Sequence, residues 1–186
     1  MIISEQYFID QMQGSIPGVE MNISLEETIE DVTGAIEDYL GRKVSVEKYH
    51  ENVADFRISD GAYLPLYRPV VYAYDDQTDG NRIIKRSGDV EYLSGWLLPG
   101  EDEAQILDRF NLDHSTELLL SPVPRAIKRV ALKLTAYELT SAVQNQYGRS
   151  SKTVVTGGTT ATIERQDTEF VNRELHKLLK YAVLTL

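Results

Sequence analysis

The residues around Lys152 are the strongest candidates in this chain for phosphate chemistry. The stretch GRSSKTVVTGGTTATI places Lys152 directly before a threonine and follows the pair with Gly157 and Gly158. A phosphate-binding P-loop needs G-x-x-x-x-G-K-[ST] and then a helix, so that backbone N–H groups surround the phosphates. Here Ser151 precedes the lysine, and strand-forming threonines and valines follow it. The stretch therefore predicts a short β-hairpin near residues 153–164, with the two glycines in its turn.

Candidate metal ligands form incomplete sets. The stretch DDQTDGN resembles the start of a calcium loop, but Gln77 takes the middle ligand position and Arg86 stands where the closing glutamate is needed. A hairpin turn at Asp79 and Gly80 accounts for the same residues. The three histidines lie far apart without an H-E-x-x-H pattern, and the chain has no cysteine. We therefore expect a protein that is not an enzyme, with no catalytic residue, metal or cofactor.

The composition is typical of a folded, acidic protein of ordinary domain size. The chain has 186 residues, of which 42% are hydrophobic, so we expect one domain over residues 1–186. Its 29 acidic and 19 basic side chains give a net charge of −10, which disfavours broad attraction to nucleic acid or anionic lipid. The lack of cysteine fits a reducing cytoplasm, and no apolar run approaches the roughly 20 residues that cross a bilayer.

Helical periodicity predicts three long helices, at about residues 24–41, 125–147 and 168–184. In the first, Ser24 and Glu27 form a capping box, and Gly41 suits the left-handed cap at the end. The second begins after a proline and ends before Gly148, as helices commonly do. A further short helix is expected before GSIPG, in residues 1–22, which we interpret as an N-terminal arm.

The region between the first two long helices has a different pattern. Short runs of Tyr, Val, Ile and Phe between Asp-Gly turns predict β-hairpins inserted at about residues 44–98, one of them turning at Asp60 and Gly61. The acidic stretch PGEDEAQ is expected to be a loop or the start of a short helix. The predicted fold class is therefore α+β, mainly a helical bundle with inserted hairpins.

The helix at 125–147 carries apolar residues on two sides, and both sides need cover. The first stripe consists of Ile127, Val130, Ala131, Leu134 and Tyr137. The second stripe, Leu132, Ala136, Leu139 and Val143, faces either its own domain or another subunit. Basic residues near the start of this helix could pair with the acidic helix of a neighbouring copy. The candidate subunit-contact residues are Leu132, Ala136, Leu139, Val143, Arg125, Lys128, Arg129, Glu26 and Glu30.

Five pieces of the sequence follow one another in a particular order: AIEDYLGRKV, LPLYRPVVYAY, VPRAIKRVALKLTAYELTS, GRSSKTVVTGGTTATI and ELHKLLKYAVL. This order resembles the head-tail connector proteins of long-tailed bacteriophages. The resemblance covers about Leu25 to the C-terminus and lies in the order of the pieces. The sequence departs from the family pattern in the N-terminal piece and in the insertion-like segment 90–117.

The resemblance implies a structural virion protein of the neck, assembled in the host cytoplasm. It implies a homo-oligomeric ring of twelve copies that joins the portal to a tail or stopper protein and encloses DNA without sequence-specific binding. Residues 150–186, with the C-terminal hairpin and helix, would dock on the portal. The implied portal contacts are Phe170, Leu175, Leu178, Leu179 and Val183, and the implied projecting hairpins carry Thr156, Gly157, Gly158, Thr159, Asp79 and Gly80.

Two other functions remain open at this point. A tail completion or terminator subunit would also form a ring. A small non-enzymatic adaptor of the bacterial host would instead work as a monomer or dimer.

Overall fold

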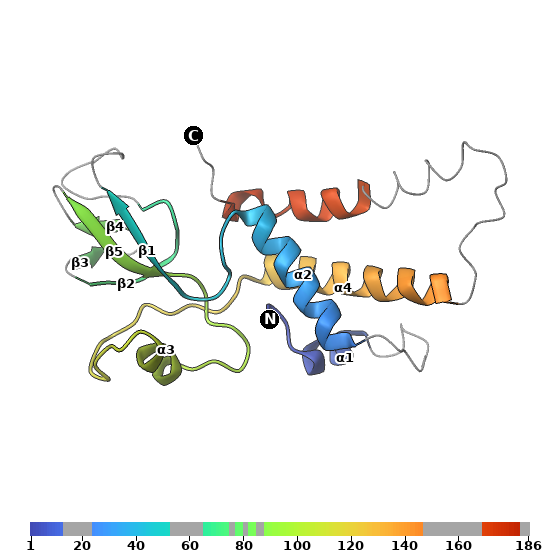
Figure 1. Cartoon of the computed structure of the whole chain (residues 1–186), viewed down its shortest axis with the longest axis horizontal. Coiled ribbons are helices and arrows are strands. Elements are labelled where there is room, and N and C mark those ends of the chain that lie inside the picture. Colours follow the sequence, from blue (N-terminus) through green and yellow to red (C-terminus); the bar gives the residue numbers. More distant parts are fainter. Residues whose placement is uncertain are drawn as a thin grey trace. The chain divides into compact units, whose positions relative to one another are not determined.

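The computed structural model describes residues 1–12, 24–52, 65–74, 77–79, 82–84, 88–146 and 169–182. The described residues have a mixed α+β fold (Figure 1). They divide into two compact units, which we call the helical unit, Met1–Leu40 with Pro124–Ala182, and the β unit, Gly41–Val123. The single domain over residues 1–186 stays a prediction, and the inserted β region builds hydrophobic clusters of its own.

The helical unit confirms two of the three predicted long helices. α1 spans Glu5–Met12, α2 spans Leu25–Leu40 and α4 spans Arg125–Gln146. The last predicted helix, 168–184, is shorter: residues 169–176 are α-helical, and a turn and the 3₁₀ helix η2, Leu179–Tyr181, follow. The helix ends where hydrogen bonds to the residue three positions back replace the α-helical pattern. The Leu178 N–H, for example, donates to the Leu175 carbonyl at 2.8 Å.

α2 has the predicted C-terminal glycine cap and one of the two hydrogen bonds of the predicted N-terminal capping box. The Ser24 hydroxyl oxygen accepts the backbone N–H of Glu27 at 3.2 Å, which satisfies one of the open donors of the first turn. Gly41 has φ 66°, the left-handed conformation that ends a helix at low cost for glycine. These two residues set the length of α2.

The first residues of the chain belong to the core of the helical unit. Ile2 and Ile3 are fully buried, and Phe8 of α1 is 2% exposed. The Ile2 N–H donates to the Thr33 hydroxyl of α2 at 3.3 Å. Residues 1–12 are therefore not a separate arm, and the rest of the predicted arm, 13–22, lies outside the described residues.

The β unit is built around a central strand. β5, Asp89–Ser94, pairs antiparallel with β1, Glu47–Asn52, on one side and with β2, Val70–Ala73, on the other. β3, Gln77–Asp79, and β4, Arg82–Ile84, form a separate antiparallel pair. Asp79 lies opposite Arg82, which confirms the predicted hairpin across Asp79 and Gly80.

Several predicted turns lie outside the described residues. These are the hairpin at Asp60 and Gly61, residue Gly80 itself, and the whole hairpin at 153–164 with Thr156, Gly157, Gly158 and Thr159. The segment 90–117, which looked like an insertion, contains most of β5 and the helix α3, Glu103–Arg109. α3 begins with a complete capping box between Asp102 and Gln105.

The central sheet has a hydrophobic cluster for each face. One cluster joins Val70, Ala73, Ile83, Val90 and Tyr92. The other joins the sheet to α3 and the chain that follows it, through Val46, Val71, Leu93, Ile106, Leu107 and Leu118. The β unit is thus a small sheet with apolar cover on both faces.

A buried arginine joins the start of the β unit to its sheet. Arg42 is 6% exposed, and its guanidinium donates to the Arg68 carbonyl and, at 3.0 Å, to the Ser94 hydroxyl. The same group lies 4.7 Å from the centre of the Trp96 ring. Burial lowers the pKa of Arg42 from its ordinary value. These contacts leave the buried cation with polar and aromatic partners.

Gly95, directly after β5, cannot be replaced without moving the backbone. It has φ 144°, and an added Cβ would lie 2.2 Å from the Ser45 carbonyl oxygen. We expect Gly95→Ala to destabilise the β unit by about 3 kcal/mol or more. Gly100 is the matched control, since it also has a positive φ, 87°, but open space around it. Gly100→Ala should cost only about 1 kcal/mol.

Denaturant unfolding followed by tryptophan fluorescence measures both variants, because the single tryptophan, Trp96, is 5% exposed within the β unit. Equal losses in the two variants would contradict the predicted collision with Ser45.

Candidate interaction site on the helical unit

The helix α4 is covered over much of its circumference by its own unit. Among the α4 residues 125–141, whose side chains the structure describes, those at most 4% exposed are Ile127, Val130, Ala131, Leu134, Thr135 and Leu139. α2 packs against α4. The helical residues 169–176 also contact α4, because the rings of Tyr137 and Phe170 stack with centroids 4.8 Å apart. One apolar stripe of α4 is therefore core, as its periodicity predicts.

The second stripe divides into core and surface. Leu139 is 1% exposed, so it belongs to the core of the helical unit and is not available as a subunit contact. Leu132 and Ala136 are half-buried, and the side chain of Val143 lies outside the described residues. For Leu139 this is the first of the two alternatives that the sequence left open, because periodicity does not tell which segments of the same chain cover a stripe.

Leu132 and Ala136 continue a line of exposed arginines. Arg125, Arg129, Leu132 and Ala136 follow one another at spacings of four, three and four residues, which places them along one side of a helix. We call these four residues the basic strip. Arg125 and Arg129 are exposed, and their guanidinium groups have no ion pair or hydrogen bond among the residues that the structure describes.

The other predicted basic residues of α4 do not join the strip. Lys128 is half-buried. Lys133 donates to the Glu174 carboxylate at 3.2 Å, and Lys177 donates to the same group. Burial alone raises the pKa of Glu174, but the hydrogen bonds from Lys177 and Lys133 outweigh it and leave that pKa lowered. Lys133 therefore binds the C-terminal helical segment to α4.

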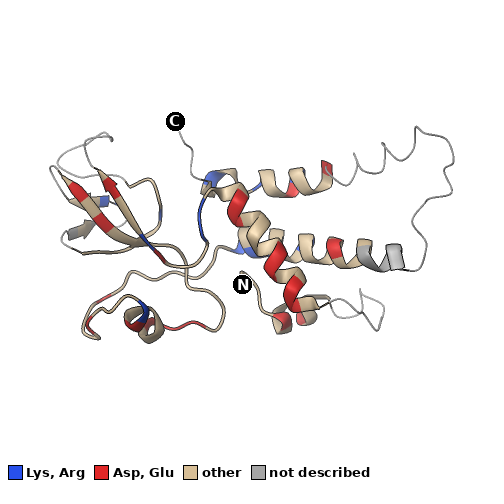
Figure 2. Ribbon diagram, in the orientation of Figure 1, with Lys and Arg blue, Asp and Glu red and all other residues tan. Residues whose placement is uncertain are grey.

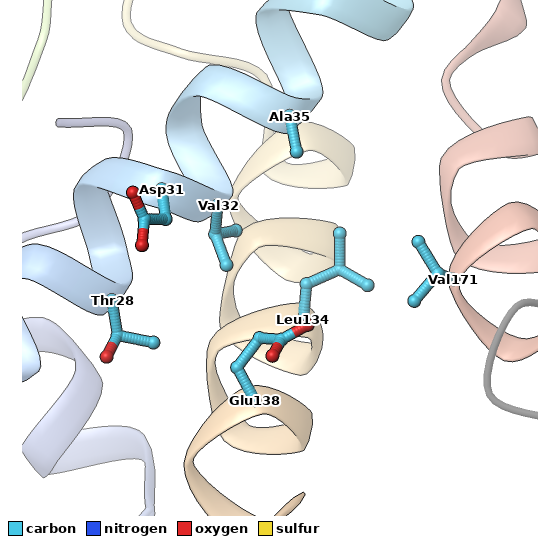
Figure 3. Close-up of a pocket in the computed structure, with 7 residues that line it drawn as sticks. All are labelled: Thr28, Asp31, Val32, Ala35, Leu134, Glu138 and Val171. Carbon is cyan, nitrogen blue, oxygen red and sulfur yellow. The ribbon is translucent and has the colours of Figure 1, made fainter. Parts of the chain in front are cut away.

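A groove lies between α2, α4 and the helical residues 169–176. Its volume is about 430 Å³, and Figure 3 shows side chains from all three segments around it. We call it the acidic groove, because two exposed carboxylates, Asp31 and Glu138, stand beside apolar side chains. Within the described part of the chain, neither carboxylate has an ion pair or hydrogen bond. The groove is lined by Thr28, Asp31, Val32, Ala35, Leu134, Glu138 and Val171.

The acidic groove opens beside a wider acidic surface. α2 contains no Lys or Arg, and Figure 2 shows Asp and Glu along this helix. The predicted subunit-contact residues Glu26 and Glu30 are exposed on it, as are Glu27 and Asp31. Like charges so close together raise the local negative potential, which attracts cationic groups.

The predicted portal contacts have unequal access to a partner. Leu175 and Leu178 are 8% and 0% exposed, so both belong to the core of the helical unit. Phe170 is half-buried against Tyr137, while Leu179 is 40% exposed. Val183 lies outside the described residues. Of the four predicted portal contacts that the structure describes, Leu179 has the most exposed side chain.

Comparison with known proteins leaves the family open. The chain matches no protein-family model, and it has no significant match among the curated proteins. Over the described ranges, the structure contains no group of three His, Asp or Glu side chains that could hold a metal ion. No helix in those ranges is long and apolar enough to span a bilayer.

Leu139 and Leu132 are expected to respond differently to truncation. Leu139→Ala removes a core side chain and should destabilise the helical unit by about 2–5 kcal/mol. Leu132→Ala, the matched variant on the half-buried side of the same helix, should cost less than about 1.5 kcal/mol. Thermal and denaturant unfolding followed by circular dichroism measures both. Similar losses would contradict the division of the second stripe into core and surface.

Proposed function

We propose that this protein is a head-tail connector, a structural subunit of a ring in the neck of a long-tailed bacteriophage. The ring would join the portal of the head to the tail or a stopper protein and continue the DNA channel. In this account the protein assembles in the host cytoplasm, becomes part of the virion and carries out no catalysis.

The observation that carries the proposal is the order of elements. An amphipathic helix ends at Gly41, a β unit follows, and a long helix begins after Pro124. A further helical segment, 169–176, packs on that long helix. This order agrees with the connector pattern that the sequence resembles. The resemblance to connectors lies in the order of the helices and strands along the chain, so the proposal rests on that order and not on a single motif.

The charge of the protein supports a role beside DNA. The net charge is −10, and exposed acidic residues line α2. An acidic wall repels phosphate groups, so DNA that passes along it is not held by counterion release. A channel subunit needs this property, whereas a protein that grips DNA needs basic surface.

The helical unit also has surfaces that a partner could cover. The basic strip and the acidic groove both carry charges that find no partner among the described residues. In the proposed assembly, residues 150–186 dock on the portal, with Leu179 offering an exposed apolar side chain. The β3–β4 hairpin would face the tail or stopper protein.

Light scattering and electron microscopy of the purified chain, with and without the portal protein of the same phage, test the proposal. We expect closed rings, formed either by the chain alone or on the portal, with a central opening wide enough for duplex DNA. An unrelated portal protein is the control and should not recruit the chain. A stable dimer that ignores the portal would contradict the connector function. A ring that binds tail protein instead of portal would indicate a tail completion subunit.

A further inference from the structure

We propose that the acidic groove is the receptor for the basic strip of a second copy of this chain. This inference rests on the proposed ring function, and it specifies which two surfaces meet at each subunit contact. The occupant of the groove is thus the first half of α4 from the neighbouring copy, with Arg125 and Arg129 beside Asp31 and Glu138.

Charge is the first argument for this occupant. The groove has two exposed carboxylates, and the strip has two exposed guanidinium groups, all four without partners in the described part of the chain. Arg125 and Arg129 are four residues apart, so their side chains are neighbours on the helix surface. A planar guanidinium can bind a carboxylate through two parallel hydrogen bonds, which fixes orientation as well as adding attraction.

The apolar parts of the two surfaces also match. Beyond its arginines the strip continues with half-buried Leu132 and Ala136. The groove offers exposed Ala35 and half-buried Val171 to a partner, while the buried core residues Val32 and Leu134 form its floor. Figure 3 shows Asp31 next to Val32 on α2 and Glu138 next to Leu134 on α4, with Val171 on the third segment. A helix that carries both kinds of residue along one side can enter such a groove.

The positions of the two surfaces determine how copies assemble. Arg129 and Glu138 are nine residues apart on α4. At about 100° per residue, the helix rotates by roughly two and a half turns between them. The two residues therefore lie on opposite sides of one helix, so the strip of one copy cannot enter its own groove. Each copy instead presents its strip to one neighbour and its groove to another. Head-to-tail contacts of this kind produce a ring when the rotation between copies closes.

Charge reversal tests the inference in solution, by sedimentation and light scattering at low salt. The groove-reversed protein carries Asp31→Arg and Glu138→Arg, and the strip-reversed protein carries Arg125→Glu and Arg129→Glu. Each should lose at least about tenfold in association constant, because both contacts become repulsive. An equimolar mixture of the two should regain association, since each reversed surface then meets its complement. A protein with all four changes should associate as the wild type does.

Two controls keep the result specific to these surfaces. Glu5→Arg on α1 and Arg82→Glu on β4 make the same kinds of charge change at other exposed positions and should leave association unchanged. Circular dichroism establishes that each variant is folded. If Asp31→Arg with Glu138→Arg does not fold, Asp31→Asn with Glu138→Gln replaces it, and the expected loss is about threefold or more.

Three results in solution, and one on the portal, would overturn the inference. These are reversed proteins that associate as strongly as the wild type, a mixture that stays dissociated, and a wild type that remains monomeric at millimolar concentration or stops at a dimer. Rings that form on the portal with either reversed protein would also overturn it, yet would leave the connector function standing. Failure of the wild type to bind the portal would instead count against the connector function, whatever the strip and groove do in solution.

Discussion

The helical unit depends on how much of α4 is buried. Residues from Ile127 to Leu139 place large apolar side chains over a wide part of this helix, and water must be excluded from all of them. α2 and the C-terminal helical segment provide much of that cover, with the Lys133–Glu174 ion pair and the Tyr137–Phe170 stack at the second contact. Among the described side chains of α4, the arginines of the basic strip are exposed on one side, and Glu138 on the opposite side is exposed at the edge of the acidic groove.

This arrangement links stability to assembly. The side chains that complete the core of the helical unit cannot also bind a partner, so Leu139, Leu175 and Leu178 stabilise the fold. Arg125, Arg129, Asp31 and Glu138 are left for contacts outside the unit, because none of them has an ion pair or hydrogen bond with a described residue. Exposed ion pairs contribute little each, so a ring built on them would be reversible and sensitive to salt until the portal or tail adds further contacts.

The features that sequence predicted well are local ones. Ser24 and Gly41 cap the helix that they flank, and Asp79 belongs to the first strand of its own hairpin. A short stretch of sequence therefore determines each of these features. β5 was harder, because its central position depends on pairing with β1, about forty residues earlier in the chain. The burial of Leu139 was left undecided, and the acidic groove was not predicted, for the same reason. Both depend on which distant segments pack together, and periodicity records only that a face is apolar.

The central claim is that copies of this chain assemble head to tail through opposite sides of α4. Because the protein has no cysteine, one variant with Ala136→Cys on the basic strip and Ala35→Cys in the acidic groove tests it directly and keeps all four charged residues. Ala136 lies on the side of α4 that faces away from Glu138 and the groove, so the two thiols of one copy point to different neighbours. After the folded protein reacts with a short bismaleimide, denaturing electrophoresis should show a ladder of covalent oligomers beyond the dimer. A product that remains monomeric, or that stops at the dimer, would contradict head-to-tail assembly.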